Sequence, residues 1–167
     1  MASPRDYKNT IIPNWCPGCG DYGIQNAISA VCAKKGWANE DITLISGIGC
    51  SSRIGGYQYC YGAHTTHGRA LPFAQGIKCA NKDTHMIVCS GDGDSYAIGL
   101  GHAMHAMKRN VDITYLVFDN QVYGLTKGQT SPASSQGFVT KTTPDGNPMT
   151  PLDAPSICLL YTSDAAD

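Results

Sequence analysis

Two apolar runs separated by a glycine turn and a helical stretch dominate the pattern of hydrophobic and polar positions. The first run, 86–89, leads into Gly91-Asp92-Gly93, and the second, 113–118, ends in Asp119-Asn120. Short apolar runs on either side of a helix are typical of a βαβ unit with two buried parallel strands. Because the crossover in such a unit is right-handed, both strands finish at the same edge of the sheet. We therefore expect Asp92 and Asn120 to lie at one sheet edge, where open α/β sheets bind ligands.

The remaining pattern predicts an α/β fold with a mostly parallel sheet flanked by helices. Apolar residues recur at helical spacing from Ile24 to Cys32, so we expect a helix with one buried face, ended by Gly36. A loop should lead to His67. Strands are expected at 42–48, 85–90 and 112–119, and a further helix at 68–78.

The two ends of the chain differ from its central part. Residues 1–14 are polar and are expected to form an extended arm, whereas residues 15–156 should hold the α/β domain. The polar stretch after Gly124 is long enough to be either a functional loop or poorly ordered. Residues 157–167 do not continue the pattern and look like translated adapter read-through, with a native tail as the alternative. We therefore expect the domain to be incomplete at its C-terminus.

Composition and charge narrow the class of protein. The 167 residues carry a formal net charge of −1 and are 42% hydrophobic, and their Lys and Arg residues are scattered. The length and hydrophobic content favour one folded domain. The scattered basic residues form no patch that would bind nucleic acid or a membrane surface. No apolar run approaches the ~20 residues of a membrane span, and the N-terminus lacks the apolar region of a signal peptide. We expect a cytoplasmic protein with no nucleic-acid partner and no membrane partner.

Three of the eight cysteines are placed where they could share a metal. Cys16 and Cys19 form a Cys-x-x-Cys loop, and Cys50 ends the next expected strand, which should return close to that loop. In a cytosolic chain, cysteines indicate metal binding, redox chemistry or burial rather than a disulfide framework. Three thiolates suit zinc with one ligand missing, or a [4Fe–4S] cluster with one cysteine missing. A redox pair and a simple turn are the alternatives for the Cys-x-x-Cys motif.

The turn Gly91-Asp92-Gly93 matches neither of the common nucleotide-binding fingerprints. In the G-x-G-x-x-G register the third glycine would fall at Tyr96, and no G-x-x-x-x-G-K-[ST] run occurs. The glycines allow a phosphate to approach the backbone, and the helix that follows offers N–H groups to an anion. Asp92 and Asn120 supply the oxygen ligands that Mg²⁺ prefers beside phosphate. The pattern therefore favours a site for a cation and a diphosphate over a plain tight turn.

Several motifs together resemble one known family. Gly91-Asp92-Gly93, followed by a spacer of 26 residues and Asn120, is similar to the thiamine-diphosphate motif. Further stretches resemble the β subunit of 2-oxoacid:ferredoxin oxidoreductases, namely WCPGCGDYGI, SGIGCSSRIGGY, HTTHGRALPFAQGIK and DNQVYGLTKGQTSP. The resemblance covers residues 15–155 without a large gap. It implies a thiamine-diphosphate-binding fold.

The resemblance also implies roles for residues at the strand ends. Mg²⁺ would be held by Asp92, Asn120 and the backbone carbonyl of Val122, and His67 would donate a hydrogen bond to the cofactor phosphate. Further residues would line the cofactor, some of them at the end of another expected strand: Ile48, Gly49, Cys50, Ser51, Gly93, Asp94, Gly124 and Leu125.

The cysteines and two basic residues would complete the implied site. Cys16, Cys19 and Cys50 would ligate a [4Fe–4S] cluster whose fourth ligand is missing from this chain. Lys127 would face the second carboxylate or the carbonyl of the substrate, with a solvated lysine as the alternative. Arg53 is a weaker candidate for the same role.

The implied reaction is the oxidative decarboxylation of a 2-oxoacid to acyl-CoA, with electrons passed through the cluster to ferredoxin. The motifs favour 2-oxoglutarate over pyruvate. The only glutamate is Glu40, ahead of the first strand, so an α subunit should supply the glutamate that activates the pyrimidine ring. The chain alone is therefore expected to be inactive. The alternatives are a cluster-free thiamine-diphosphate decarboxylase or lyase, and a non-catalytic binding domain stabilised by zinc.

Overall fold

A four-stranded parallel sheet forms the centre of the computed structural model, which describes residues 2–161. Within this range the strand order is β2-β1-β3-β4, and each neighbouring pair is parallel. The strands are β1 (Ile42–Ser46), β2 (Tyr61–His64), β3 (His85–Gly91) and β4 (Thr114–Phe118). The predicted α/β class with a mostly parallel sheet is confirmed.

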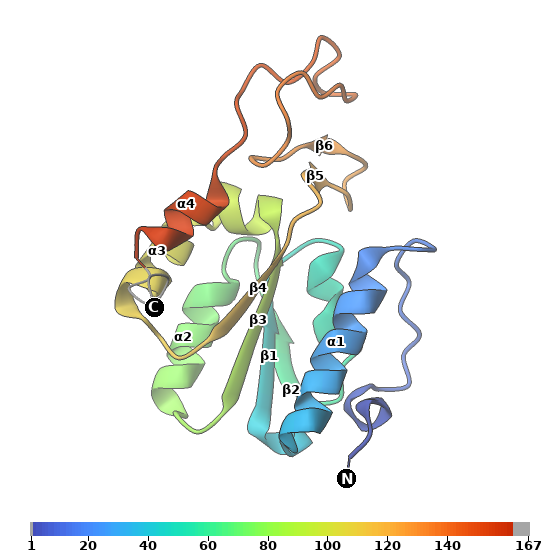
Figure 1. The fold of residues 1–167 in the computed structure, drawn as a ribbon, viewed down its shortest axis with the longest axis vertical. Coiled ribbons are helices and arrows are strands. Elements are labelled where there is room, and N and C mark those ends of the chain that lie inside the picture. Colours follow the sequence, from blue (N-terminus) through green and yellow to red (C-terminus); the bar gives the residue numbers. More distant parts are fainter. Residues whose placement is uncertain (1, 162–167) are drawn as a thin grey trace.

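Helices cover both faces of the sheet (Figure 1). On one face lie α1 (Gly20–Lys35) and the 3₁₀-helix η3 (Ser51–Gly56), and on the other lie α2 (Ala70–Ala80) and α3 (Leu100–Arg109). The shorter elements are η1 (Pro4–Tyr7), η2 (Asn39–Asp41), the π-helix η4 (Asp94–Ile98), β5 (Val122–Tyr123), β6 (Gln129–Thr130) and α4 (Ala154–Leu159). The antiparallel pair β5–β6 lies above the ends of β3 and β4 (Figure 1).

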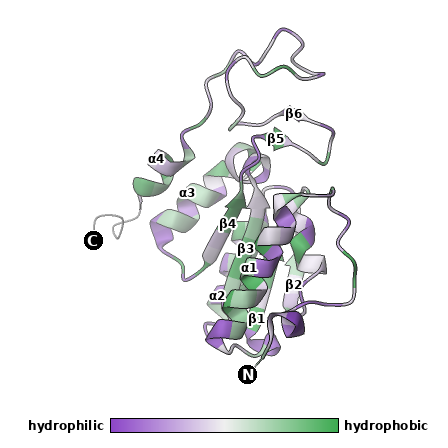
Figure 2. Ribbon diagram, turned by 45° about the vertical axis from the view of Figure 1, so that its right-hand side comes forward, coloured by the Kyte–Doolittle hydropathy of each residue, from purple (hydrophilic) through white to green (hydrophobic). Residues whose placement is uncertain are grey.

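Each face of the sheet has its own apolar core, because successive residues of a strand point to opposite faces. Leu44 belongs to the core under α1 together with Ile28 of that helix, whereas its neighbour Ile45 belongs to the core under α2 and α3. Ile45 and Val88 are both 0% exposed. The strands are largely hydrophobic, and hydrophilic residues gather on the outer sides of helices and in loops (Figure 2). The continuous apolar runs seen in the sequence reflect this burial on both faces.

One strand was missed by the sequence pattern. The loop expected before His67 contains β2, which forms the edge of the sheet beside β1. The expectation of an uninterrupted loop was wrong, because a short edge strand with mostly exposed side chains carries no buried apolar pattern. The other strands occur with small shifts; β1, for example, ends at Ser46 instead of residue 48.

The N-terminal segment is folded onto the domain. Residues Pro4–Tyr7 form η1, and Tyr7 is buried with its hydroxyl donating to the carbonyl of Trp37 at 2.7 Å. The amide of Tyr59 donates to the carbonyl of Tyr7 at 2.9 Å. The expectation of an extended arm was therefore wrong for this segment, because Tyr7 contributes to the core under α1.

The C-terminal part was expected to begin with a functional or poorly ordered loop. The polar stretch after Gly124 contains β6 and is held by the buried Asn147, whose amide donates to the carbonyls of Ser134 and Met149 at 3.1 and 3.2 Å. The first residues of the expected non-native tail complete α4, and residues 162–167 of that tail lie outside the described residues.

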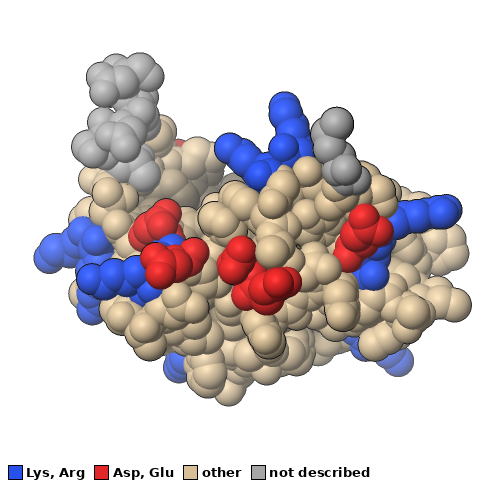
Figure 3. All heavy atoms as spheres, turned by 90° about the horizontal axis from the view of Figure 1, so that it is seen from below, with Lys and Arg blue, Asp and Glu red and all other residues tan. Residues whose placement is uncertain are grey.

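The face opposite β5 and β6 carries both signs of charge. Acidic side chains lie across its middle, and Lys and Arg side chains lie toward its rim (Figure 3). Lys78 forms an ion pair with Asp112 at 2.8 Å. Within residues 2–161, none of the helices has both the length and the apolar character needed to cross a membrane.

Replacing Ile45 by alanine should test the core under α2. Because Ile45 is 0% exposed, the Ile45→Ala variant should lose about 2–5 kcal/mol of unfolding free energy in urea denaturation. Ile12, which is 86% exposed, provides the control, and Ile12→Ala should change stability by less than about 0.5 kcal/mol. Equal effects of the two changes would contradict the assigned core.

Candidate functional site

The candidate site lies at the edge where the parallel strands end. Gly91, the last residue of β3, pairs with Phe118, the last residue of β4. This register places Asp92 beside Asp119, directly before Asn120. The two strand ends that the sequence predicted to meet are therefore neighbours in the sheet.

Asp92 is a buried carboxylate with a specific hydroxyl partner. It is 2% exposed, and the hydroxyl of Ser131 donates to its Oδ2. Burial raises the pKa of Asp92 above its ordinary value, the Ser131 hydrogen bond opposes this, and the charge of Asp119 adds to the rise. A cation would reverse the effect of burial, since an opposite charge favours the ionised form.

Asn120 belongs to a tight loop between β4 and β5. Its Oδ1 accepts a hydrogen bond from the amide of Val122 at 3.2 Å, and Gln121 between them has a φ of 60°. A β-carbon at Gly124 would lie 3.5 Å from Asn120 Nδ2 and 3.8 Å from Cys50 Sγ. The loop therefore brings the Asn120 amide into the neighbourhood of Cys50.

Tyr123 covers the glycine turn. A β-carbon at Gly93 would lie only 2.2 Å from the Tyr123 ring, so a larger residue here would have to displace that ring. The Tyr123 hydroxyl donates to the carbonyl of Gly93 at 3.3 Å, and its ring lies edge-on to His67 with centroids 6.3 Å apart. Burial raises the pKa of Tyr123, and the charges of Asp92 and Asp94 add to it. Tyr123 thus joins the loop that carries Asn120 to the glycine turn.

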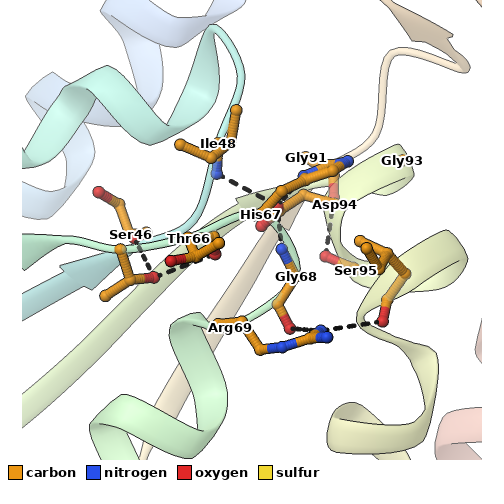
Figure 4. A network of polar contacts seen from close by, with 12 residues as sticks. Ser46, Ile48, Thr66, His67, Gly68, Arg69, Gly91, Gly93, Asp94 and Ser95 are labelled. Atoms are coloured by element: carbon orange, nitrogen blue, oxygen red, sulfur yellow. Dashed lines mark hydrogen bonds and ion pairs between the residues drawn. The ribbon is translucent and has the colours of Figure 1, made fainter.

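Asp94 is a buried residue that follows β3 and bonds to the segments that follow β1 and β2 (Figure 4). Its Oδ1 accepts hydrogen bonds from the amide of Ile48 at 3.1 Å, the amide of Gly68 at 2.7 Å and His67 Nδ1 at 2.5 Å. Its Oδ2 is buried, has no hydrogen-bond partner among residues 2–161, and lies against Gly47. Its hydrogen bonds hold Ile48, Gly68 and His67 in place. The expectation that Asp94 lines the cofactor stays a prediction. A donated Nδ1 proton leaves His67 Nε2 for another partner.

The loop after β1 runs along the same edge. Gly49 has a φ of 126°, and a β-carbon at Gly91 would lie 3.3 Å from the hydroxyl oxygen of Ser51. Ile48 and Ser51 therefore lie beside the glycine turn, as the sequence predicted for this rim. Their contact with a cofactor stays a prediction.

The three candidate cysteines are free thiols within electrostatic reach of one another. Burial raises the pKa of Cys50, Asp21 adds to it, Arg53 opposes it, and Cys19 and Cys16 raise it slightly further. Among residues 2–161, no three His, Cys, Asp or Glu side chains are already arranged as a metal-ligand group. Three neighbouring thiols are nevertheless a donor set that suits a soft metal or an iron–sulfur cluster. The cluster stays a prediction.

The two basic candidates differ in their surroundings. Lys127 is exposed, and its φ of 77° places it in a turn closed by its own amide on the carbonyl of Gly124 at 3.1 Å. Arg53 donates to Asn14 Oδ1 and so lies toward the N-terminal segment. Leu125, expected to line the cofactor, is 45% exposed. The turn keeps Lys127 and Leu125 close to Gly124, at the end of the Asn120 loop.

Ser131, Tyr123 and Gly47 were not singled out from the sequence. Ser131 is 39 positions from Asp92, so no local pattern could connect them. Both Ser131 and Tyr123 lie in the stretch DNQVYGLTKGQTSP, whose match to the family was the one available signal.

The donor set around Asp92 fits Mg²⁺ and a diphosphate. A carboxylate, an amide oxygen and a backbone carbonyl are hard oxygen ligands, and they follow strand ends beside a glycine turn. A parallel sheet with these residues at its edge is what the thiamine-diphosphate motif implied. Residues 47–165 match the family described as thiamine pyrophosphate enzyme, C-terminal TPP binding domain, and the chain belongs to this family.

Within this family the chain is similar to β subunits of 2-oxoacid:ferredoxin oxidoreductases, which confirms the resemblance. It is 46% identical over 155 residues to the 2-oxoglutarate oxidoreductase subunit KorB of Mycobacterium tuberculosis, covering 93% of this chain and 42% of that protein. It is 44% identical to the 2-oxoglutarate synthase subunit KorB of Archaeoglobus fulgidus, covering 95% and 60%. These relatives are oxidoreductase subunits.

A solved structure matches the same fold. It is the 2-oxoglutarate:ferredoxin oxidoreductase from Magnetococcus marinus with 2-oxoglutarate, coenzyme A and succinyl-CoA bound. The TM-score is 0.94 at 43% identity, and the match covers 96% of this chain and 55% of that chain. The chain thus spans about half the length of the relatives it matches.

A side chain at Gly47 should destabilise the fold, because it would clash with the Asp94 carboxylate. A β-carbon there would lie 1.8 Å from Asp94 Oδ2, so Gly47→Ala should displace this carboxylate and lower the unfolding free energy by about 1–3 kcal/mol. Gly23 in α1 has nothing within 4 Å of such a β-carbon. The control Gly23→Ala should therefore stabilise the chain by up to about 1 kcal/mol in the same urea titration. Similar effects of both changes would argue against the Asp94 contact.

Proposed function

We propose that this chain is the thiamine-diphosphate- and Mg²⁺-binding β subunit of a 2-oxoacid:ferredoxin oxidoreductase. Its reaction would be the oxidative decarboxylation of a 2-oxoacid to acyl-CoA, with 2-oxoglutarate favoured by the names of the similar proteins. The observation that carries the proposal is the buried Asp92 carboxylate beside the Asn120 loop at the edge of a parallel sheet. Residues 15–156 would form the cofactor-binding domain, in a cytoplasmic enzyme.

The residues at the strand ends would bind and orient the cofactor. Asp92, Asn120 and the carbonyl of Val122 would hold Mg²⁺. His67 would donate from Nε2 to a phosphate with both of its ring nitrogens protonated, because its Nδ1–H already donates to Asp94. The cofactor supplies, when bound, the nucleophilic carbon and the electron sink for decarboxylation. The chain's own contribution is therefore charge neutralisation and orientation.

The rest of the rim would line the cofactor and the substrate. Lys127 would face the carboxylate or carbonyl of the 2-oxoacid, which its exposure permits, and Arg53 is a weaker candidate because it donates to Asn14. The residues proposed to line the cofactor itself are Ile48, Gly49, Cys50, Ser51, Gly93, Asp94, Gly124 and Leu125.

Electrons would leave through the cysteines. Cys16, Cys19 and Cys50 would hold a [4Fe–4S] cluster whose fourth ligand is missing from this chain, and ferredoxin would accept the electrons. Both Cys50 Sγ and Asn120 Nδ2 lie within 4 Å of a β-carbon built at Gly124, which supports a short path from cofactor to cluster. An α subunit would supply the glutamate for the pyrimidine ring, and coenzyme A would receive the acyl group.

Calorimetric titration with thiamine diphosphate should test the cation site. The wild-type chain should bind the cofactor only when Mg²⁺ is present, and Asp92→Ala should weaken that binding by more than about a hundredfold because it removes a direct metal ligand. Asp145, an exposed carboxylate in the later loop, provides the control Asp145→Ala with unchanged affinity. Tight zinc binding without Mg²⁺-dependent cofactor binding would instead favour the zinc-stabilised binding domain.

Anaerobic reconstitution with iron and sulfide should test the cluster. The wild-type chain should gain the broad visible absorption of thiolate-to-iron charge transfer, and Cys16→Ser or Cys50→Ser should lose most of it, since each removes a ligand. Cys79 is exposed on α2, and Cys79→Ser should behave like the wild type. Thiamine-diphosphate binding without any reconstituted absorption would favour the cluster-free decarboxylase or lyase.

A further inference from the structure

Ser131 is buried against the carboxylate of Asp92. It is 3% exposed, and its hydroxyl donates to Asp92 Oδ2. The hydroxyl oxygen of Ser131 also accepts a hydrogen bond from the amide of Ala133 at 3.2 Å. Because this amide occupies the acceptor side of the hydroxyl, the proton of Ser131 is directed toward Asp92.

The segment that carries Ser131 is fastened to the loop that carries Asn120. Thr130, just before Ser131, pairs with Val122 in the β5–β6 ladder. The hydroxyl of Ser134 accepts from the amide of Ser131 at 2.8 Å and donates to the carbonyl of Gln121 at 2.5 Å. The position of Ser131 is therefore fixed relative to the same backbone that would supply the other oxygen ligands.

A second carboxylate, that of Asp119, lies near the end of the neighbouring strand. Asp119 lies beside Asp92 at the strand ends, but it is exposed and its Oδ1 accepts from the amide of Gln121 at 3.0 Å. Asp92 is the buried one of the two and the one with a hydroxyl partner. Hydrogen bonds from a neighbouring group are the usual means by which a metal-binding carboxylate is held in one orientation.

We propose that Ser131 is a positioning residue for the metal site, holding the Asp92 carboxylate in the orientation that binds the cation. This inference rests on the proposed function, because it assigns Asp92 as a cation ligand. Ser131 would act through Asp92 and would not itself be a ligand. A charge-assisted hydrogen bond from a hydroxyl fixes the rotation of the carboxylate.

The test is metal affinity, separated from cofactor affinity. Mn²⁺ serves as the probe in place of Mg²⁺, and the electron paramagnetic resonance of free Mn²⁺ reports how much is bound in the presence of thiamine diphosphate. Ser131→Ala should weaken Mn²⁺ binding about tenfold, the lower end for loss of a partner behind a metal ligand. Ser131→Thr keeps the hydroxyl and should bind Mn²⁺ within about threefold of the wild type, since its donor is retained.

Ser29→Ala is the matched control. Ser29 is as buried as Ser131, at 0% exposed, but it lies in α1 and its hydroxyl donates to the backbone carbonyl of Gln25 at 3.0 Å. If Ser29→Ala weakened Mn²⁺ binding as much as Ser131→Ala, the effect would belong to the loss of any buried hydroxyl and the proposal would be overturned. Wild-type-like Mn²⁺ affinity of Ser131→Ala would overturn it as well.

Two further measurements separate this inference from the proposed function. Thermal unfolding shows whether Ser131→Ala is folded under the conditions of the titration. If it is not, Ser131→Cys keeps the size of the side chain, replaces the hydroxyl by a weak donor, and should show the same loss of Mn²⁺ affinity. Wild-type chain that binds Mn²⁺ and loses it in Asp92→Ala supports the proposed function, whatever Ser131→Ala does. If the wild-type chain binds no Mn²⁺ in the presence of thiamine diphosphate, both the proposed function and the role of Ser131 are overturned.

Discussion

The parallel pairing of β3 with β4 is the constraint on which the candidate site depends. Because Gly91 pairs with Phe118, the residues that follow each strand emerge side by side. A slip of one residue would turn every side chain of a strand to the opposite face and separate its apolar residues from their cores. The two cores therefore fix the register, and the register fixes the position of Asp92 beside the Asn120 loop.

Two buried aspartates follow β3, and they perform different tasks. Asp94 turns toward the ends of β1 and β2 and accepts three donors on one oxygen, so it ties the edge together. Asp92 turns toward the segment after β6, where Ser131 is its side-chain partner. A buried carboxylate is unfavourable unless its charge is compensated. The protein supplies one oxygen of Asp94 with three hydrogen-bond donors, whereas a cation would complete the compensation of Asp92.

The sequence predicted most of what is local and little of what is distant. The strands, the helix ended by Gly36 and the glycine turn all carry short periodic or turn signals. The edge strand β2 has exposed side chains and no such signal. The contact between Ser131 and Asp92 joins positions that no periodicity links, and it arises because β6 pairs with β5 and returns the chain to the sheet edge.

Proximity of the Cys-x-x-Cys loop to Cys50 was also expected, but the structure gives a reason that the pattern did not contain. Trp15, directly before Cys16, is buried and donates from Nε1 to the carbonyl of Cys50 at 2.7 Å. Its ring lies edge-on to Tyr22 and Tyr57, with centroids 5.2 and 4.9 Å away. One side chain thus anchors the loop of two thiols to the backbone of the third. The position of the Cys-x-x-Cys loop relative to Cys50 therefore depends on the packing and the hydrogen bond of Trp15.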